Sequence, residues 1–289
     1  MSNKVVVFGG SGYLGSYVSD CLSLKGYDVT IFDLKESQYI QPNQKMVEGD
    51  ILDLEKVKNV AKDQDYVYNF AGMADLDSST TQPIETIKLN LEGTLNILQA
   101  CKDEDVKRFV FASSIYVYSN KGGFYRCSKQ AAEIYIEEFQ QRYNVDFTIL
   151  RYGTLYGPRA NENNSAYRYI KQALEDKKIR VAGDGEEIRE YIHVRDAAEL
   201  SVKVLNDEFK NGHYIITGHH PMRLKDLLGT LTEMLKDKVK IEYKPGTNPH
   251  HYSMTPYSYI PKIGKKLTSN CYTDLGQGLL ECLEQFSDK

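Results

Sequence analysis

The stretch KVVVFGGSGYLG, residues 4–15, decides the fold class, because it joins a strand to a helix through a turn of glycines. Its first half is a β-branched, apolar run that is typical of a buried strand. Gly9, Gly12 and Gly15 follow at three-residue spacing. In such a turn one glycine allows the tight bend, a second lets a pyrophosphate approach the backbone, and a third packs helix against strand. Unpaired N–H groups at the helix start then meet the anion, so the stretch predicts dinucleotide binding.

Strand-like and helix-like segments continue to alternate after this turn. We expect strands at DVTIFD (28–33), DYVYNFAG (65–72), VKRFVFASS (106–114) and VDFTILR (145–151). The longest predicted helices are PIETIKLNLEGTLNILQACKDE, which begins at Pro83, and FYRCSKQAAEIYIEEFQQRYN. Near-continuous apolar strands separated by helices are typical of a parallel sheet that is covered on both faces. The predicted fold is a Rossmann-like, doubly wound α/β fold.

Acidic residues after the next two strands refine the dinucleotide prediction. Asp33 ends the second strand, where a carboxylate accepts hydrogen bonds from a ribose diol and repels a 2′-phosphate. NAD is therefore favoured over NADP, although Lys35 is close enough to leave NADP open. In GDILD, Asp50 and Ile51 are predicted to flank the adenine, with the alternative that Asp50 only caps a turn.

The regular alternation ends after Arg151, and this change suggests a second, smaller part. We expect residues 1–155 to form the NAD-binding domain, with 186–217 returning to it through the strand-like HYIIT. Residues 156–185 and 218–289 are predicted to form an α+β substrate-binding lobe. The Pro- and Tyr-rich stretch TNPHHYSMTPYSYIPKIGKKL within it is a candidate for a substrate lid or a dimer contact.

Composition excludes several classes of function. The 289 residues are 41% hydrophobic and 26% charged, with a net charge of -4 and scattered basic residues, so nucleic-acid binding is not expected. Five cysteines lie far apart and no metal-ligand spacing occurs, so no metal is expected. The sequence has neither a signal-peptide-like start nor an apolar run of the roughly 20 residues that span a bilayer. We expect a cytoplasmic protein without a membrane partner.

Nine motifs in order make the pattern specific: GGSGYLG, Asp33, GDILD, NFAG, KLNLEGTLNIL, FASSIYVY, YRCSK, LRYGTLYGPR and GDGEEIREYIHVRD. With them the chain resembles the extended short-chain dehydrogenase/reductase family, in its nucleotide-sugar epimerase and dehydratase branch, as far as about Asp196. The resemblance implies NAD, a nucleotide-sugar substrate and a homodimer formed through the two long helices. It also adds these predicted cofactor-binding residues: Tyr13, Leu14, Phe70, Ala71, Gly72, Asn90, Tyr125 and Lys129.

The resemblance further implies a catalytic set of Ser114, Tyr125 and Lys129. Tyr125 and Lys129 lie one helical turn apart and so share a face. A free tyrosine is a poor base at neutral pH, but the ammonium of Lys129 and a positive nicotinamide ring favour the phenolate. Ser114, rather than Ser113, stands three residues before Val-Tyr, as in the family, and hydrogen-bonds the substrate hydroxyl. Ser113 is expected to turn back toward the sheet.

Departures from the family pattern reduce the number of reactions that this chain is expected to catalyse. Family members that are 4,6-dehydratases carry Asp and Glu directly after the catalytic Ser/Thr, and the decarboxylases keep the Glu, whereas this chain has Ile115 and Tyr116. Both reactions are therefore disfavoured. Thr154 replaces a common Asn, and Arg189 matches an arginine that grips the nucleotide diphosphate, unless it only pairs with a neighbouring glutamate. The predicted substrate-binding residues are Ser114, Tyr116, Thr154, Arg159, Asn164 and Arg189, with Asn163 as a further candidate.

Three functions remain open on this basis. The leading prediction is an NAD-dependent nucleotide-sugar epimerase, at C4, that passes through a 4-keto sugar while NAD stays bound. A reductase or dehydrogenase of a nucleotide sugar would use the same residues and consume the cofactor. A non-catalytic NAD-binding regulator would need the glycine turn but not Tyr125 and Lys129.

Overall fold

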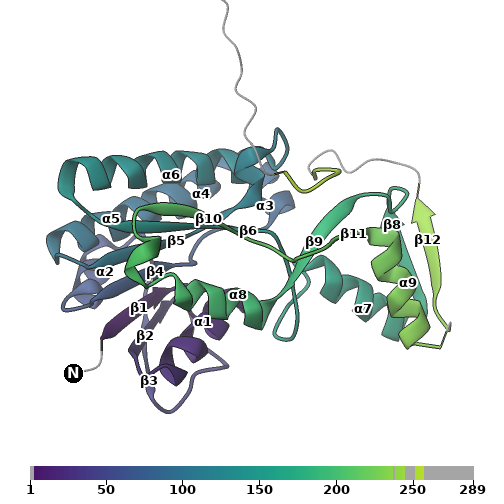
Figure 1. Cartoon of the computed structure of the whole chain (residues 1–289), viewed down its shortest axis with the longest axis horizontal. Helices are drawn as coiled ribbons and strands as arrows, with labels where there is room; N and C mark the ends of the chain where they lie inside the picture. Colours follow the sequence, from purple (N-terminus) through teal and green to yellow (C-terminus); the bar gives the residue numbers. More distant parts are fainter. Residues whose placement is uncertain (1–2, 237, 245–250, 257–289) are drawn as a thin grey trace, which may run out of the picture. The chain divides into compact units, whose positions relative to one another are not determined.

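The computed structural model describes residues 3–236, 238–244 and 251–256. Within them, a seven-stranded sheet has the order β10-β6-β5-β4-β1-β2-β3, and all neighbouring strands pair in parallel (Figure 1). The order reverses between β1 and β4, which opens a crevice at the carboxyl ends of these strands. The strands are β1 (Lys4–Phe8), β2 (Asp28–Asp33), β3 (Gln44–Glu48), β4 (Tyr66–Asn69), β5 (Arg108–Ser114), β6 (Phe147–Tyr152) and β10 (Gly212–Ile216).

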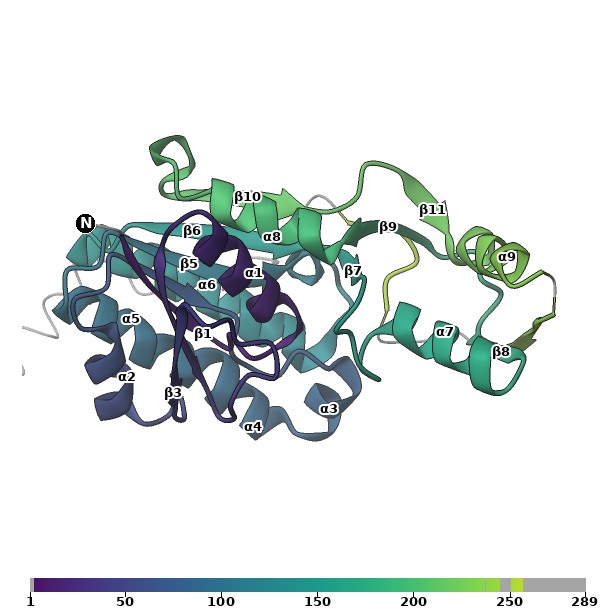
Figure 2. The same cartoon turned by 90° about the horizontal axis from the view of Figure 1, so that it is seen from below.

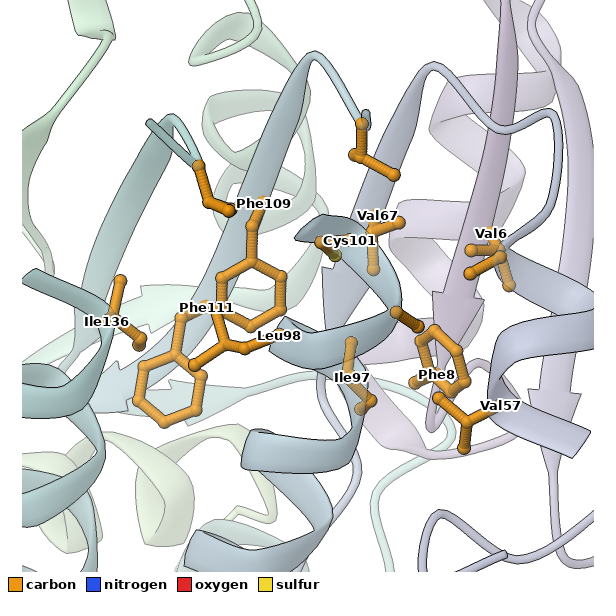
Figure 3. Packing of buried hydrophobic residues seen from close by; sticks show 14 of the residues in the cluster. Val6, Phe8, Val57, Val67, Ile97, Leu98, Cys101, Phe109, Phe111 and Ile136 are labelled. Atoms are coloured by element: carbon orange, nitrogen blue, oxygen red, sulfur yellow. The ribbon is translucent and has the colours of Figure 1, made fainter. Parts of the chain in front are cut away.

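Helices cover both faces of this sheet, because alternate strand residues point to opposite faces. Val6 and Phe8 of β1 pack with α2 (Leu54–Ala61), α5 (Gly93–Asp103) and α6 (Gly123–Tyr143), as Figure 3 shows for part of this core. On the other face, Val5 and Val7 pack with α1 (Tyr13–Leu24) and α8 (Val194–Lys203), which lie side by side in Figure 2. The predicted doubly wound fold is confirmed.

The long helix predicted from Pro83 is interrupted in the structure. It consists of α4 (Pro83–Ile87), a π-helical turn η1 (Lys88–Glu92) and α5. Such turns inside helices are rare and widen the backbone locally. Asn90 lies within η1 and is fully buried. A further short helix, α3 (Leu76–Thr81), follows β4 and was not expected from the sequence.

The remaining elements form two small sheets with helices beside them. One sheet has the order β11-β9-β7 and the other pairs β12 with β8. Ala173 of α7 and Leu228 of α9 pack with strand residues Ile179 and Val181 in a separate small core, grouped apart from the large sheet in Figures 1 and 2. The elements of the two small sheets and their helices are β7 (Thr154–Tyr156), α7 (Ser165–Glu175), β8 (Lys178–Ala182), β9 (Ile188–His193), β11 (Pro221–Arg223), α9 (Leu224–Met234) and β12 (Lys240–Lys244). Elsewhere in the described residues, η2 (Ile115–Tyr118) and η3 (Asp207–Phe209) are short 3-10 helices.

Of the Pro- and Tyr-rich stretch, only residues 251–256 lie within the described residues. This segment is joined to β9, because the Ile188 N–H donates to the Ser253 carbonyl at 2.8 Å and Ile188 forms a β-bridge with Met254. The described residues include no helix with the length and apolarity of a membrane span.

Candidate active site

The glycine turn between β1 and α1 has no room for side chains. Gly9 adopts a left-handed backbone with φ 76°, and a Cβ there would lie 2.5 Å from the Ala71 nitrogen. A Cβ on Gly15 would lie 2.2 Å from the Gly9 carbonyl oxygen. Gly12 precedes α1 without a side-chain cap, and the first turn of α1 carries no acidic residue. The Ser11 and Gly12 N–H groups donate to Asp33 and to the Gly9 carbonyl, so the N–H groups left for an anion are those at the uncapped start of α1.

A cavity of about 260 Å³ lies on one side of the glycine turn. Asp33 lines it, and its carboxylate is oriented by the Ser11 N–H at 3.0 Å and the Leu34 N–H at 2.8 Å. Asp50 also lines it and at the same time accepts from the Leu52 N–H at 2.9 Å, so the two interpretations of this residue are compatible. The other lining residues are Gly9, Gly12, Phe32, Leu34, Gly49, Ile51, Phe70, Ala71, Gly72 and Leu89.

A larger cavity, of about 650 Å³, lies on the other side of the same turn. It extends past the start of α1 to the end of β5 and the first turns of α6. Ser114, Tyr125 and Lys129 therefore meet in one cavity, as the sequence predicts. Its lining residues are Gly9, Gly12, Tyr13, Leu14, Gly15, Phe70, Gly72, Met73, Ala74, Asp75, Ser78, Gln82, Ala112, Ser113, Ser114, Tyr125, Lys129, Tyr152, Gly153, Leu155, Asn161, Asn163 and Asn164.

The Tyr125 phenol is buried beside Ser114. Burial raises the pKa of Tyr125, while a hydrogen bond with Ser114 lowers it by less. The predicted lowering of this pKa is therefore absent with protein groups alone, because desolvation of the phenolate outweighs the favourable contact. The Ser114 hydroxyl also accepts from the Tyr116 N–H at 3.3 Å, which fixes its position at the start of η2.

Lys129 lines the same cavity as Ser114 and Tyr125. Its ammonium donates to the Ala112 carbonyl at 2.8 Å and lies 4.7 Å from the Phe111 ring centroid and 6.0 Å from that of Tyr125. Burial lowers the pKa of Lys129 to about 8, and the charge of Glu133 opposes this shift. Since neutral pH is below this value, Lys129 remains largely protonated there.

Glu133, one turn after Lys129, is held by a buried polar network. Its carboxylate accepts from Arg151 Nη2 at 2.6 Å and from Arg151 Nε at 3.1 Å, a two-pronged ion pair. The Ser113 hydroxyl also donates to it, and Arg151 donates to the Tyr118 hydroxyl. Ser113 thus turns away from Ser114 toward α6, and the network ties the end of β5 to the helix that carries Tyr125.

The predicted substrate-binding residues other than Ser114 lie in three places. Asn164 lines the larger cavity and caps α7 by accepting from the Tyr167 N–H at 3.1 Å. Tyr116, Thr154 and Arg189 instead meet at Tyr252 of the segment 251–256. Its ring centroid lies 4.8 Å from that of Tyr116 and 4.3 Å from the Arg189 guanidinium carbon, and its side chain hydrogen-bonds Thr154. The Tyr116 hydroxyl lies 2.6 Å from His251 Nδ1.

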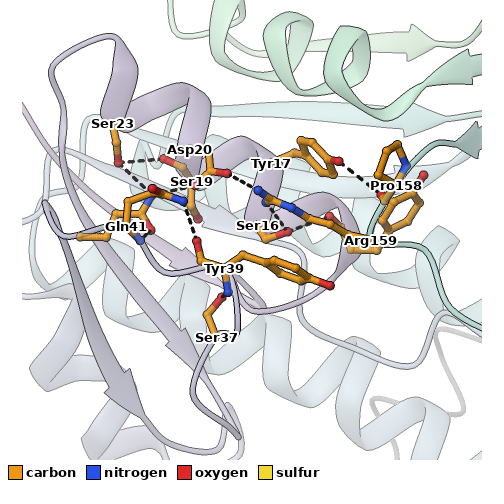
Figure 4. A network of polar contacts seen from close by, with 12 residues as sticks. Ser16, Tyr17, Ser19, Asp20, Ser23, Ser37, Tyr39, Gln41, Pro158 and Arg159 are labelled. Atoms are coloured by element: carbon orange, nitrogen blue, oxygen red, sulfur yellow. Dashed lines mark hydrogen bonds and ion pairs between the residues drawn. The ribbon is translucent and has the colours of Figure 1, made fainter.

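Arg159 does not point into the cavity, contrary to the sequence-based interpretation. Its guanidinium donates to Asp20 at 2.8 Å and to the Ser16 hydroxyl at 3.2 Å, both on α1 (Figure 4). The ion pair already satisfies its charge, so we no longer assign it a direct substrate contact.

The model of the NAD dependent epimerase/dehydratase family matches residues 5–217. The chain belongs to this family. The UDP-glucuronate 4-epimerase of Thermodesulfobacterium geofontis is 28% identical over 273 residues, 82% of this chain and 82% of that protein. The UDP-N-acetyl-alpha-D-glucosaminuronate decarboxylase of Bacillus cytotoxicus is 26% identical, covering 100% of this chain and 99% of that protein. Among solved structures, UDP-glucose 4-epimerase of Thermotoga maritima matches with a TM-score of 0.82 and 25% identity, over 89% of this chain and 90% of that one.

NAD is thus the cofactor that the family implies, as the sequence predicts, and the residues present fit it. The narrow glycine turn would admit a pyrophosphate against the uncapped start of α1. The oriented carboxylate of Asp33 suits a ribose diol in the smaller cavity. Both features are backbone and side-chain arrangements of the protein itself, so they support the assignment independently of the family match.

Asn90 hydrogen-bonds to two segments beside this site. It accepts from the Met73 N–H at 2.7 Å, and its amide donates to the Met73 carbonyl at 3.0 Å and the Ser128 hydroxyl at 2.9 Å. A Cβ on Gly72 would lie 2.4 Å from Asn90 Oδ1, so the two residues are closely fitted. Asn90 therefore acts here as a bridge between the loop after β4 and α6, although the sequence suggested a cofactor contact.

Sequence reasoning missed the segment after β4 that lines the larger cavity. Asp75 begins α3 and accepts from the Ser78 N–H at 2.8 Å and the Ser78 hydroxyl at 2.5 Å. A signal was present, because loops after parallel strands gather at the carboxyl edge of the sheet, and DLDS offers a capping residue three positions before its partner. The missed lining residues with polar side chains are Asp75, Ser78 and Gln82 in this segment, and Tyr152 and Asn161 elsewhere in the chain.

Proposed function

We propose that the protein is an NAD-dependent nucleotide-sugar 4-epimerase. The observation that carries the proposal is the convergence of Ser114, Tyr125 and Lys129 on a cavity that adjoins the glycine turn. UDP-glucuronate and UDP-glucose 4-epimerases among the similar proteins support it. The cavity volume of about 650 Å³ lies within the range of small-molecule sites.

Each of the three residues has a separate role at the sugar 4-hydroxyl. Tyr125 takes the hydroxyl proton when the sugar is oxidised and returns it when the sugar is reduced. Ser114 hydrogen-bonds the same oxygen and steadies it as its charge changes. Lys129 keeps positive charge beneath Tyr125 and favours its phenolate. NAD, when bound, supplies hydride acceptance from C4 and its return to the opposite face of the keto sugar.

The two positions after Ser114 argue against elimination and decarboxylation. Ile115 is fully buried and apolar, and the Tyr116 hydroxyl is engaged with His251. Burial raises the pKa of Tyr116, so it is a poor base. Relatives include decarboxylases and dehydratases, but these positions offer no carboxylate for a second proton transfer.

The charge of the cavity favours a neutral sugar. Among its lining residues within the described part of the chain, Lys129 carries the sole cationic side chain, and it is already bound to the Ala112 carbonyl. Asp75 adds a carboxylate to the same lining. A uronate would gain no ion pair there and would face this negative charge. We therefore expect neutral hexoses or N-acetylhexosamines to be preferred.

Incubation of the purified protein with UDP-glucose, UDP-N-acetylglucosamine and UDP-glucuronate, without added cofactor, tests the proposal. Proton NMR and mass spectrometry should show a 4-epimer of unchanged mass from a neutral sugar. Conversion only after addition of NAD or NADH, with a two-dalton change, would make the protein a dehydrogenase or reductase. Conversion of UDP-glucuronate alone would contradict the assignment of the sugar class.

A further inference from the structure

A loop between β7 and α7 reaches across to the helix that follows the glycine turn. The Gly157 carbonyl accepts from the Tyr13 hydroxyl at 3.4 Å, and the Pro158 carbonyl accepts from the Tyr17 hydroxyl at 3.3 Å. Both tyrosines belong to α1. The next residue, Arg159, adds the charged contact between the same loop and α1.

The guanidinium of Arg159 lies between two tyrosine rings. Its central carbon is 4.2 Å from the Tyr17 ring centroid and 4.3 Å from the Tyr39 ring centroid (Figure 4). A planar guanidinium stacks on aromatic faces while its N–H groups still bond in its plane, as they do here to Asp20. Arg159 has a left-handed backbone with φ 64°, which is uncommon for a residue with a side chain. These contacts hold it in that conformation.

The contacts of Arg159 join three segments that are distant in the sequence. Asp20 also accepts, through its other oxygen, from the Gln44 amide at 3.2 Å, at the first residue of β3. Tyr39 belongs to the connection between β2 and β3, which begins after Asp33. One side chain thus fixes the loop to α1 and to the strand edge beside the smaller cavity.

The same loop continues into the wall of the larger cavity. Asn161, Asn163 and Asn164 line it together with Gly12 and Tyr13 at the start of α1. The loop therefore bounds the cavity beside the uncapped N–H groups that suit a pyrophosphate. If the loop moved away from α1, this side of the cavity would open.

We propose that Arg159 is a positioning residue that latches this loop over the cofactor site and slows the release of NAD. The proposal deepens the proposed function, because an epimerase must keep its cofactor through both halves of the cycle. Arg159 acts through the loop and not by touching NAD, since its charge is paired with Asp20. Lysine at this position would keep the charge but lose the stacking and the planar fork.

The test measures release of labelled NAD from the loaded protein during a chase with excess unlabelled NAD, without any nucleotide sugar. We expect at least tenfold faster release from Arg159→Ala, an intermediate rate from Arg159→Lys, and faster release from Asp20→Asn. Arg180→Ala is the matched control, because Arg180 is an exposed arginine whose side chain pairs with Asp176, outside the loop. Its release rate should stay within twofold of the unaltered protein.

Release from Arg159→Ala within twofold of the unaltered protein would overturn the latch. If this variant does not fold, Asp20→Asn and Tyr39→Leu decide in the same assay, because each removes one side of the contact. Weaker nucleotide-sugar binding with unchanged NAD release would instead restore a substrate contact for Arg159. Since release is measured without a sugar, the result does not depend on whether the reaction is an epimerisation.

Discussion

Tyr125 lies in the first turn of α6, with its phenol buried against Ser114 and above the Lys129 ammonium. Replacing it by Phe removes the proton acceptor and keeps the ring. We expect Tyr125→Phe to lower turnover by roughly 10²–10⁴-fold, the usual contribution of a positioned acid or base. NAD binding, measured by the chase assay, should change little. Tyr143→Phe, an exposed tyrosine on the same helix, should leave turnover unchanged, and retained turnover in Tyr125→Phe would contradict its role.

The pH dependence of turnover is expected to report on Lys129. In the proposed mechanism the protonated form of Lys129 is the active one, and burial lowers the pKa of Lys129 to about 8, so turnover should fall as the pH rises through this value. Glu133 raises that pKa. Glu133→Gln removes the charge, so the alkaline limb should move to lower pH by roughly 1 unit.

The measurement is kcat/KM against pH for both proteins, with Glu137→Gln as the control on the same helix. Glu137 is partly exposed and pairs with His213 at 2.9 Å, away from Lys129. An alkaline limb at the same pH in Glu133→Gln and the unaltered protein would show that Glu133 does not set the protonation of Lys129.

Single residues were predictable where a motif specifies both type and spacing. The larger cavity is lined by Ser114, Tyr125 and Lys129, which the sequence grouped together. The smaller cavity is lined by Asp33. Arg159 shows the limit, because its contacts depend on Tyr39 and Asp20, which no local pattern connects to it. The upward shift of the Tyr125 pKa likewise depends on burial, which is a property of the folded chain.

At the scale of elements, the turn between β1 and α1 depends on close backbone approach. A Cβ on Gly15 would lie 2.2 Å from the Gly9 carbonyl oxygen, so the turn must shift in Gly15→Ala. We expect a loss of about 1–3 kcal/mol in the free energy of unfolding, together with weaker NAD binding. Gly229 in α9 has open space around it, and Gly229→Ala should stabilise the protein by up to about 1 kcal/mol.

Urea unfolding of both alanine variants provides this comparison. Equal effects of the two substitutions would contradict the packing of the glycine turn.

Strand and helix alternation was predictable from apolar periodicity, and the strands of the large sheet follow it. The π-helical turn around Asn90 was not predictable. It accompanies the close packing of Asn90 against Gly72 and its hydrogen bond from Met73, which helix propensity does not encode.

At the scale of the whole molecule, apolar side chains on neighbouring helices suggest how two copies associate. Ile84 and Ile87 of α4 and Ile134 of α6 are exposed, and these two helices contact each other. Contiguous exposed apolar surface often marks an interface. We expect a homodimer through this surface, since the resemblance implies a dimer contact through residues 83–102, which include α4, and through α6.

Ile134→Asp should therefore produce monomers in sedimentation velocity, because a charge would be buried at the interface. Leu24→Asp is the control, since Leu24 is an exposed leucine at the end of α1. A monomeric unaltered protein, or a dimer that tolerates Ile134→Asp, would contradict this surface.

The doubly wound architecture followed from the order of the motifs, since glycine turn, acid and alternating strands each constrain the same topology. The arrangement of the second part did not follow in detail. Its sheets pair β9 with β7 and β11, and β12 with β8, and these contacts join segments with no regular alternation. Tyr252 meets Tyr116 and Arg189 from the segment 251–256, which is joined to β9 at Ile188.

The most direct measurement uses UDP-glucose deuterated at C4, incubated with the purified protein in ordinary water without added cofactor. The account predicts a 4-epimer of unchanged mass in which the deuterium remains at C4, because the atom removed during oxidation returns to the same carbon. Loss of the deuterium to solvent, or a product that forms only when NAD or NADH is supplied and changes mass, would contradict it.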